Sequence, residues 1–347
     1  MSSGIRVPMT TSWPPLLFLL LIAVAESLNI LGSVLVVPSD SMPLRVRTYA
    51  KVLQQKLCAR LLLAADDTCF PIVTAPAPAN ASSVITLSVK LSTVAEGYSI
   101  TAAPRGLSVT GTDERGLLFG IGTLLQVADV SVTRTFSAPA VRVAYIAEAS
   151  LPLASAPQYQ LRMHQIGYRG LNNAYDAMSL PQMQQHITDL VLFGANAVEF
   201  TMANNMVSDP LDDNPLMPVD PPSWLVAMSE HADTIGINVS LWYPLELGNY
   251  SDPVVMARAS AIWRAAFALL PRLDSIFVPG GDPGGHSPDM TLMAAATQYA
   301  ILIEYHPTAT MWISAQGFKL DDLDAFFQLI SATSAASWLA GIVYGPW

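Results

Sequence analysis

Carboxylate, aromatic and amide side chains gather just after short apolar segments of the chain. The densest group is Pro279-Gly280-Gly281-Asp282-Pro283-Gly284-Gly285, in which Asp282 is the one charged residue. Glycines permit tight turns and close approach of the backbone, so this segment could present Asp282 to a ligand. The alternative is that Asp282 caps the following helix, but Ser287, directly before Pro288, is better placed for that. We therefore expect Asp282 to take part in chemistry.

Two other carboxylates have comparable surroundings. Glu199 interrupts an apolar run, and Glu246 follows the aromatic pair Trp242-Tyr243. Glu199 would point into the interior of the fold or form a salt bridge with an arginine. An aromatic pair beside a carboxylate suits a sugar, which stacks through its C–H face; the alternative is a core Trp with a surface Glu. Because hydrolysis of a glycosidic bond normally uses two carboxyl groups, Asp282, Glu199 and Glu246 are all candidate catalytic residues.

The remaining candidates have side chains that stack on sugars or bond their hydroxyls. The predicted substrate-binding residues are Arg162, His164, Arg169, Asn173, Asp176, Trp242, Tyr243, Trp312, Gln316 and Trp347. Other chemistries fit poorly, because the five histidines are scattered and no zinc-binding, nucleophile-elbow or phosphate-binding motif is present. We therefore expect neither a metal nor a cofactor.

A regular alternation of strands and helices must position these residues. Strands are predicted at 161–168, 197–202, 238–243, 275–278, 310–314 and 340–344, with helices at 181–193, 223–235, 253–270, 288–305 and 320–333. This order indicates right-handed βαβ units and a parallel sheet, either doubly wound or closed as a barrel. The lack of a glycine fingerprint and the polar residues at the strand ends favour an α/β fold of the (β/α)8 barrel type. Since about six of eight units are predicted, we expect a C-terminally truncated barrel over 161–347.

A smaller α+β domain is expected ahead of the barrel, over 26–143. Its helices are predicted at 44–63 and 113–127, a strand at 84–91, and a hairpin at 96–103 and 107–110. The proline-containing stretch 138–157 is typical of a linker, which we place at 144–160 between the two domains.

The N-terminus indicates export. Arg6 precedes an apolar run from Leu16 to Ala25, which is about half the ~20 residues needed to span a bilayer. A cleaved signal peptide over 1–25 fits better than an uncleaved anchor, and it predicts a secreted, extracellular protein. Three glycosylation sequons agree with export, beginning at Asn80, Asn238 and Asn249.

The two cysteines and the charge restrict the environment and the partners further. Cys58 and Cys69 are predicted to form a disulfide, with two buried thiols as the alternative. The 347 residues carry a net charge of −10, which argues against nucleic acid or an anionic membrane as partner. An oligosaccharide or polysaccharide substrate is expected, with no stable membrane insertion after signal cleavage.

Residues 107–127, LSVTGTDERGLLFGIGTLLQV, resemble the end of the domain that precedes the barrel in microbial β-N-acetylhexosaminidases and α-glucuronidases. The shared pattern is Arg-Gly-x-x-x-Gly-x-x-Thr-Leu-x-Gln. The resemblance implies that this domain supports the barrel, and that the barrel carries the activity.

The second half is similar to the barrels of the same two families. Gln160-Leu161-Arg162-Met163 resembles the first barrel strand of hexosaminidases, which implies that Arg162 binds sugar hydroxyls. Hexosaminidases have an Asp-Glu pair after Gly-Gly on the fourth strand; here Asp282 is kept and Pro283 replaces the glutamate that acts as acid. In α-glucuronidases the corresponding glycine-rich turn holds the general acid, a glutamate, which places Asp282 at the acid position.

The α-glucuronidase resemblance also covers Leu247-Gly248-Asn249-Tyr250-Ser251-Asp252-Pro253. Together the two resemblances imply a hydrolase of O-glycosyl bonds, hexosaminidase-like or α-glucuronidase-like. The alternative is a non-catalytic carbohydrate-binding relative, in which the change from glutamate to Pro283 marks lost catalysis.

Overall fold

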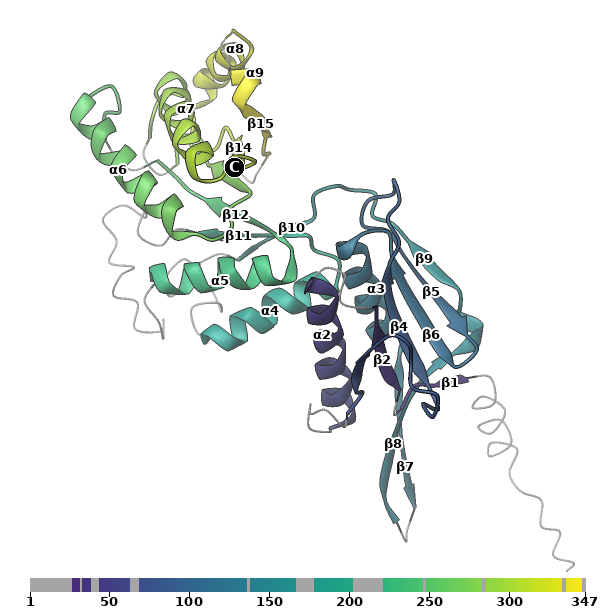
Figure 1. The fold of residues 1–347 in the computed structure, drawn as a ribbon. Helices are drawn as coiled ribbons and strands as arrows, with labels where there is room; N and C mark the ends of the chain where they lie inside the picture. The colour runs from purple at the N-terminus through teal and green to yellow at the C-terminus, as the bar shows by residue number, and fades with distance from the viewer. Residues whose placement is uncertain are drawn as a thin grey trace, which may run out of the picture. The chain divides into compact units, whose positions relative to one another are not determined.

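The computed structural model divides the chain into two compact units, Met1–Ala156 and Pro157–Trp347 (Figure 1). It describes residues 27–31, 33–38, 44–62, 69–135, 138–166, 178–201, 221–245, 248–282, 285–332 and 335–344. The predicted signal peptide at 1–25 lies outside the described residues.

The first unit is built on a mixed six-stranded sheet. Its strands lie in the order β3 (Ile72–Thr74), β2 (Val34–Val37), β4 (Val84–Val89), β6 (Gly106–Gly111), β5 (Tyr98–Ala103) and β9 (Leu153–Ser155). Strands β3, β2, β4 and β6 are parallel, whereas β5 is antiparallel to both β6 and β9. Two helices, α2 (Leu44–Leu61) and α3 (Glu114–Val127), pack on one face of this sheet (Figure 1).

Helix α3 begins at Glu114, one residue after its predicted start, and Asp113 caps it. The Asp113 carboxylate accepts hydrogen bonds from the backbone N–H of Gly116 at 2.7 Å and of Glu96 at 2.6 Å. One carboxylate therefore satisfies an open N–H of the helix and fixes the loop before β5. The predicted helices and the hairpin of this unit are confirmed, with ends shifted by one or two residues.

The boundary between the two units, after Ala156, falls inside the predicted linker 144–160, but the proline-containing stretch 138–157 includes two strands. Ala138–Ala147 forms β8, which pairs with β7 (Asp129–Thr135) and β1 (Ser27–Asn29) in a second, three-stranded sheet. Leu153–Ser155 forms β9 and pairs with β5. The prolines Pro139, Pro152 and Pro157 suggested an irregular segment, but Pro139 lies near the β7–β8 turn and the others flank β9, where a missing N–H costs little.

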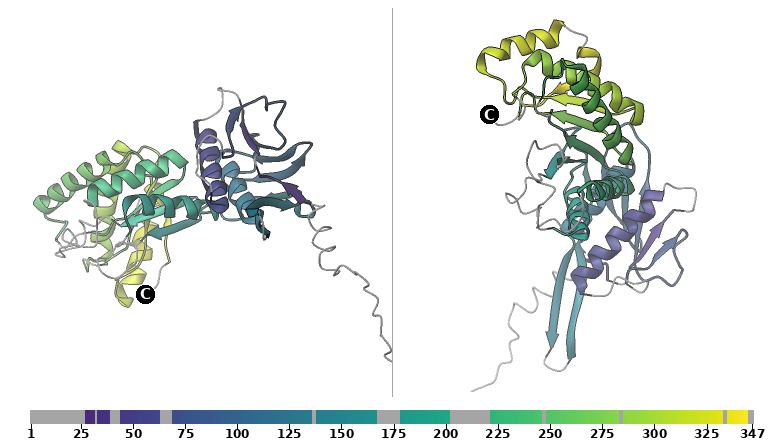
Figure 2. Two further views of the ribbon diagram at one scale, coloured as in Figure 1. Left: turned by 90° about the horizontal axis from the view of Figure 1, so that it is seen from below. Right: turned by 90° about the vertical axis from the view of Figure 1, so that its left-hand side faces the viewer.

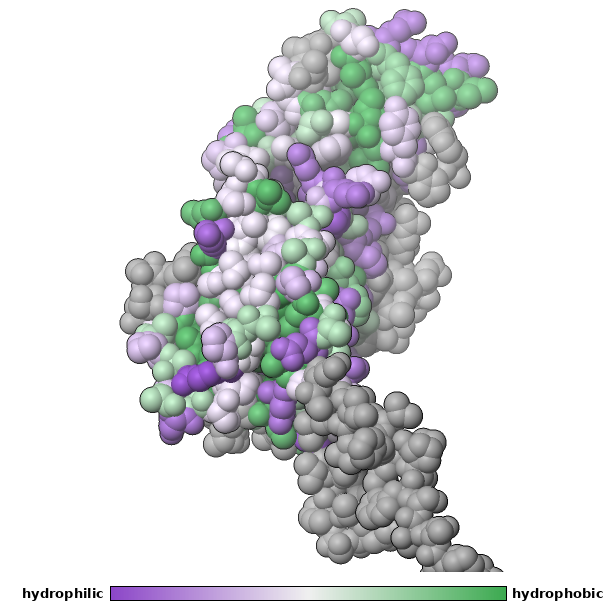
Figure 3. Space-filling model, turned by 90° about the vertical axis from the view of Figure 1, so that its right-hand side faces the viewer, coloured by the Kyte–Doolittle hydropathy of each residue, from purple (hydrophilic) through white to green (hydrophobic). Residues whose placement is uncertain are grey.

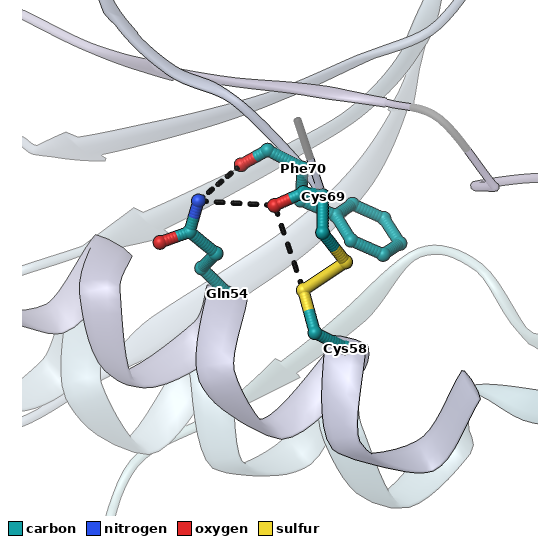
Figure 4. Close-up of a disulfide and its surroundings, with 4 residues drawn as sticks. All are labelled: Gln54, Cys58, Cys69 and Phe70. Carbon is teal, nitrogen blue, oxygen red and sulfur yellow. Dashed lines mark hydrogen bonds between the residues drawn. A yellow bond between two sulfur atoms is a disulfide. The ribbon is translucent and has the colours of Figure 1, made fainter. Parts of the chain in front are cut away.

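A disulfide joins the end of α2 to the segment before β3 (Figure 4). Cys58 is bonded to Cys69, and one helical turn earlier the Gln54 side-chain N–H₂ donates to the carbonyls of Cys69 and Phe70 at 3.0 and 3.1 Å. All four residues are buried. The covalent bond and the amide together hold this segment against the helix.

The second unit contains six parallel strands in chain order. They are β10 (Met163–Ile166), β11 (Ala197–Thr201), β12 (Asn238–Trp242), β13 (Ser275–Val278), β14 (Thr310–Ile313) and β15 (Leu339–Ile342). The helices between them are α4 (Leu180–Leu192), α5 (Pro221–Ile235), α6 (Pro253–Leu269), α7 (Pro288–Tyr305), α8 (Leu323–Ala332) and the short α9 (Ala335–Trp338) (Figure 1 and Figure 2).

The strand order distinguishes between the two predicted types of parallel sheet, doubly wound and barrel. Right-handed crossovers between strands that are neighbours in chain order place every helix on the same face. A doubly wound sheet instead reverses its order and carries helices on both faces. The order β10 to β15 has no reversal among the described strands, so the second unit is barrel-like.

Candidate functional site

The side chains of the parallel sheet alternate between a helix-covered face and an inner face. Residues in register on the helix-covered face are Ile166, Phe200, Leu241, Ile276 and Met311, all fully buried. The inner face carries a polar row of Gln165, Glu199, Ser240, Ser275 and Thr310. Next to it, towards the carboxyl ends, lies a row of Thr201, Trp242, Phe277 and Trp312. A row of bulky rings at the carboxyl ends is suited to stacking on a ligand.

Glu199 lies in the polar row and is only 3% exposed. Its Oε1 accepts from Gln165 Nε2 at 2.9 Å and its Oε2 accepts from Ser240 Oγ at 3.0 Å. Burial raises the pKa of the Glu199 carboxyl, and the hydrogen bonds from Ser240 and Gln165 oppose that rise. Its described partners are therefore neutral groups rather than an arginine.

Replacing Glu199 with Gln is expected to raise the melting temperature by a few degrees at pH 8 and to leave it unchanged at pH 4. Because the folded-state pKa is raised, the folded protein binds the proton more tightly, and stability falls as pH rises through that pKa. Gln does not titrate, and its amide can form hydrogen bonds with Gln165 and Ser240, since each of these can donate or accept. Melting curves of both proteins across pH test this, and a variant that is less stable at pH 8 than the wild type contradicts it.

Asp282 lies in a turn that interlocks with the turn after the neighbouring strand. Gln316 Nε2 donates to Asp282 Oδ2 at 2.5 Å, and the Gly281 N–H donates to the Gln316 carbonyl at 2.8 Å. Gly280 and Gly317 have φ of +62° and +73°, where glycine is favoured. A Cβ on Gly280 would lie 2.6 Å from the Gln316 carbonyl oxygen, and one on Gly317 would lie 2.7 Å from the Asp282 nitrogen. The two turns thus hold Asp282 and Gln316 together at the carboxyl ends of β13 and β14.

Trp312 belongs to the inner face, as its predicted role requires. Its Nε1 donates to Thr310 Oγ1 at 3.3 Å, and a Cβ on Gly341 would lie 2.5 Å from the indole ring. Gly341 therefore makes room for the ring beside β15. Trp242 lies on the same face but is 5% exposed.

Three of the predicted binding residues do not lie with Trp242 and Trp312 on the inner face, namely Tyr243, His164 and Arg162. Tyr243 follows Trp242 and so points to the opposite face, where its ring meets Phe267 of α6 edge-on at 6.0 Å. His164 precedes Gln165 and faces the helices for the same reason, with its ring 5.9 Å from His186 of α4. Because side chains alternate along a strand, both rings lie on the helix-covered face and not on the inner face, where the ligand was expected.

Arg162 lies at the amino end of β10, and not at the carboxyl ends of the strands, where the ligand was expected. Its Nε donates to the Gly194 carbonyl and its guanidinium also donates to the Tyr159 carbonyl, both at 2.7 Å. The Arg162 backbone N–H and C=O both bond Asn196, the residue before β11. Arg162 therefore fastens two strand beginnings together, on the side of the sheet away from Asp282.

Five predicted site residues cannot be placed. Arg169, Asn173, Asp176, Glu246 and Trp347 lie outside the described residues. Two residues that touch a candidate were missing from the predicted set, namely Gln165 and Ser240, the partners of Glu199. Only the register of three parallel strands brings them together, although the period-two pattern places each on the inner face.

Neither a metal cluster nor a membrane span is found in the part of the chain that the structure describes. There, no group of three or more His, Cys, Asp or Glu side chains is arranged to hold a metal ion. Among the same residues, every helix is too short or too polar to cross a membrane.

Residues 37–144 match a family model described as glycosyl hydrolase family 20, domain 2. A search of curated proteins finds none that matches the chain. The match places a family-20-type domain in the first unit, ahead of the barrel-like unit.

Solved structures resemble this chain over most of its length. A chitobiase of Flavobacterium johnsoniae is 12% identical with a TM-score of 0.58, covering 85% of this chain and 51% of its own. A mutant Streptomyces plicatus β-hexosaminidase in complex with the product GlcNAc is 12% identical with a TM-score of 0.58, covering 92% and 71%. A family 138 enzyme targeting pectin rhamnogalacturonan II is 13% identical with a TM-score of 0.58, covering 88% and 47%.

These likenesses define a class of fold. The chain has an α/β fold like that of these solved hexosaminidase structures, and residues 37–144 in its first unit match the family-20 model. It spans about half the length of the chitobiase.

Proposed function

We propose that the protein is a hexosaminidase-like glycoside hydrolase that holds a sugar at the carboxyl ends of the parallel strands. The observation that carries the proposal is the Asp282–Gln316 pair, which two interlocked turns hold at the carboxyl ends of β13 and β14, the strands that carry Phe277 and Trp312. A carboxylate at the ends of strands that carry aromatic rings has the chemistry to bond sugar hydroxyls while a ring covers the sugar's C–H face.

The pair also suggests how Asp282 acts. The Gln316 amide occupies Oδ2, whereas Oδ1 has no hydrogen-bond partner among the described residues. Oδ1 can therefore accept a hydrogen bond from a substrate group and orient it. Glu199, a buried acid in the neighbouring row, is the second carboxyl group that we assign to the mechanism.

The substrate class rests on the fold and on the resemblances. The family-20-type domain and the solved hexosaminidase structures support an N-acetylhexosaminide. The glycine-rich turn also supports an α-glucuronide, since α-glucuronidases hold their acid in such a turn. Pro283, in place of the glutamate that acts as acid in hexosaminidases, favours a second candidate function, carbohydrate binding without hydrolysis.

We also propose the division of labour and the location. Residues 26–143 would support residues 161–347, which carry the site. The apolar run before Ala25 and the Cys58–Cys69 disulfide support secretion into an oxidising compartment, where disulfides persist.

The test uses the full chain on aryl glycosides that differ in the sugar. Aryl β-N-acetylglucosaminide and aryl α-glucuronide are the two main substrates, and calorimetric titration with GlcNAc and with glucuronic acid measures binding separately. Turnover of either substrate supports the hydrolase. Saturable sugar binding without turnover supports the binding function instead, and a protein that neither binds nor hydrolyses any of them contradicts both.

A further inference from the structure

The open face of the first-unit sheet carries a regular array of hydroxyl side chains. The array, called the hydroxyl face below, consists of Thr86, Ser88, Ser99, Thr101, Ser108 and Thr110. The strand registers arrange these residues in two rows of three across β4, β6 and β5. One row is Thr86–Ser108–Thr101 and the other is Ser88–Thr110–Ser99.

The opposite face of the same strands is apolar and covered. Ile85, Leu87, Ile100, Leu107 and Val109 alternate with the hydroxyl residues and are all fully buried. A Cβ on Gly120 of α3 would lie 2.9 Å from the Val109 side chain, which places this helix directly on that apolar face. The hydroxyl residues therefore point away from α2 and α3, and all six are half-buried or exposed.

The hydroxyl face has unused hydrogen-bonding capacity. Ser88 and Thr110 bond each other across the strands at 3.0 Å. The hydroxyls of Thr86, Ser99 and Thr101 have no hydrogen-bond partner among the described residues of the protein. Each hydroxyl can donate one hydrogen bond and accept two, so the array offers both donors and acceptors to a partner.

The hydroxyl face also lacks charge. None of its six positions carries an ionisable side chain, and Arg105, in the turn between β5 and β6, donates instead to the carbonyls of Pro78 and Ala79. The pale area at the centre of Figure 3 shows a surface that is neither strongly hydrophilic nor strongly hydrophobic. A nucleic acid or an anionic membrane needs cations here, and an apolar partner needs an apolar patch, so neither fits.

We propose that the hydroxyl face binds an uncharged polysaccharide chain that lies across β4, β6 and β5. Such a chain presents hydroxyls that donate and accept in the same way, and its repeating unit suits an array that repeats by strand, at about 4.8 Å. The β-branched threonines lose little rotamer freedom on binding because they are already restricted. This site lies on the first unit and is separate from the one around Asp282.

The experiment is co-sedimentation of the full chain with insoluble chitin, cellulose and mannan, and with an anionic pectate gel for comparison. Binding to one of the uncharged polymers is expected, and it should not weaken in about 0.5 M salt, because no charge pair is screened. Thr101→Lys, on an exposed strand position, should weaken binding roughly five-fold or more through loss of a hydrogen bond and steric obstruction. Thr234→Lys on α5 adds the same charge at an exposed position in the other unit and should bind like the wild type.

A second variant separates binding from folding. Thr86→Val with Thr101→Val keeps the shape and the strand preference of both side chains but removes their hydroxyls, and it should also bind more weakly. Asp324→Asn, which changes an exposed carboxylate on α8 outside both sites, should bind the polymer normally. Wild-type protein that ignores all three uncharged polymers, or Thr101→Lys that binds unchanged, overturns the proposal. A wild-type dimer that Thr101→Lys dissociates also overturns the proposal, because the hydroxyl face would then be an interface between copies.

Discussion

Asp282→Asn is expected to lower kcat/KM about 10²- to 10⁴-fold on whichever aryl glycoside the full chain hydrolyses. Asn keeps the size of the side chain and can still accept a hydrogen bond from Gln316 through its amide oxygen. It replaces the other carboxylate oxygen with an N–H₂ group, which can no longer accept a hydrogen bond from the substrate. Steady-state kinetics at matched protein concentration measure the loss.

The matched control is Asp324→Asn on α8, an exposed aspartate in the same unit, which should leave kcat/KM unchanged. Both variants should melt at the wild-type temperature, so that a loss of activity is not a loss of fold. Undiminished hydrolysis by Asp282→Asn removes this carboxylate from the mechanism. Equal loss in both variants would show a charge effect rather than a local one.

Helices and parallel strands of the second unit follow the sequence pattern closely. The predicted strand 275–278 and helix 288–305 agree with β13 and α7, and the other elements differ by a few residues at their ends. Apolar periodicity predicts these elements because each helix or strand buries one face, which leaves a repeating apolar pattern in its own residues. Strands β8 and β9 were missed because prolines obscured the pattern and because β1 and β5, with which they pair, lie far away in the chain. Strand β7, which forms a hairpin with β8, was missed with them.

The sequence prediction placed the candidate site at the carboxyl ends of the strands, but it included residues that the structure does not bring together. Polar residues near each strand end were grouped without regard to side-chain alternation, so His164 and Tyr243 were included although they face the helices. Arg162 was included because Gln160-Leu161-Arg162-Met163 resembles the first barrel strand of hexosaminidases, whereas β10 begins at Met163. Gln316 was predicted to touch substrate, and the structure adds its bond to Asp282, which depends on two separate turns meeting.

Gly280→Ala is expected to destabilise the second unit by about 3–4 kcal/mol, combining left-handed backbone strain with overpacking. The new Cβ would lie 2.6 Å from the carbonyl oxygens of both Gln316 and Ser314. These are backbone atoms, so the turn after β14 must move, and the Asp282–Gln316 bond would break with it. Denaturant unfolding measures the loss, and hydrolysis should fall even where the unit remains folded.

Gly285→Ala provides the matched control for this strain. Gly285 has nearly the same φ, +64° against +62°, but a Cβ there would have no atom of the described residues within 4 Å. It should therefore cost only the backbone strain, about 1–2 kcal/mol, and leave hydrolysis unchanged. The difference between the two variants isolates the contact between the turns. If both lose the same stability and keep the same activity, the interlocked turns do not position Asp282, and the geometry on which the proposed sugar site rests is wrong.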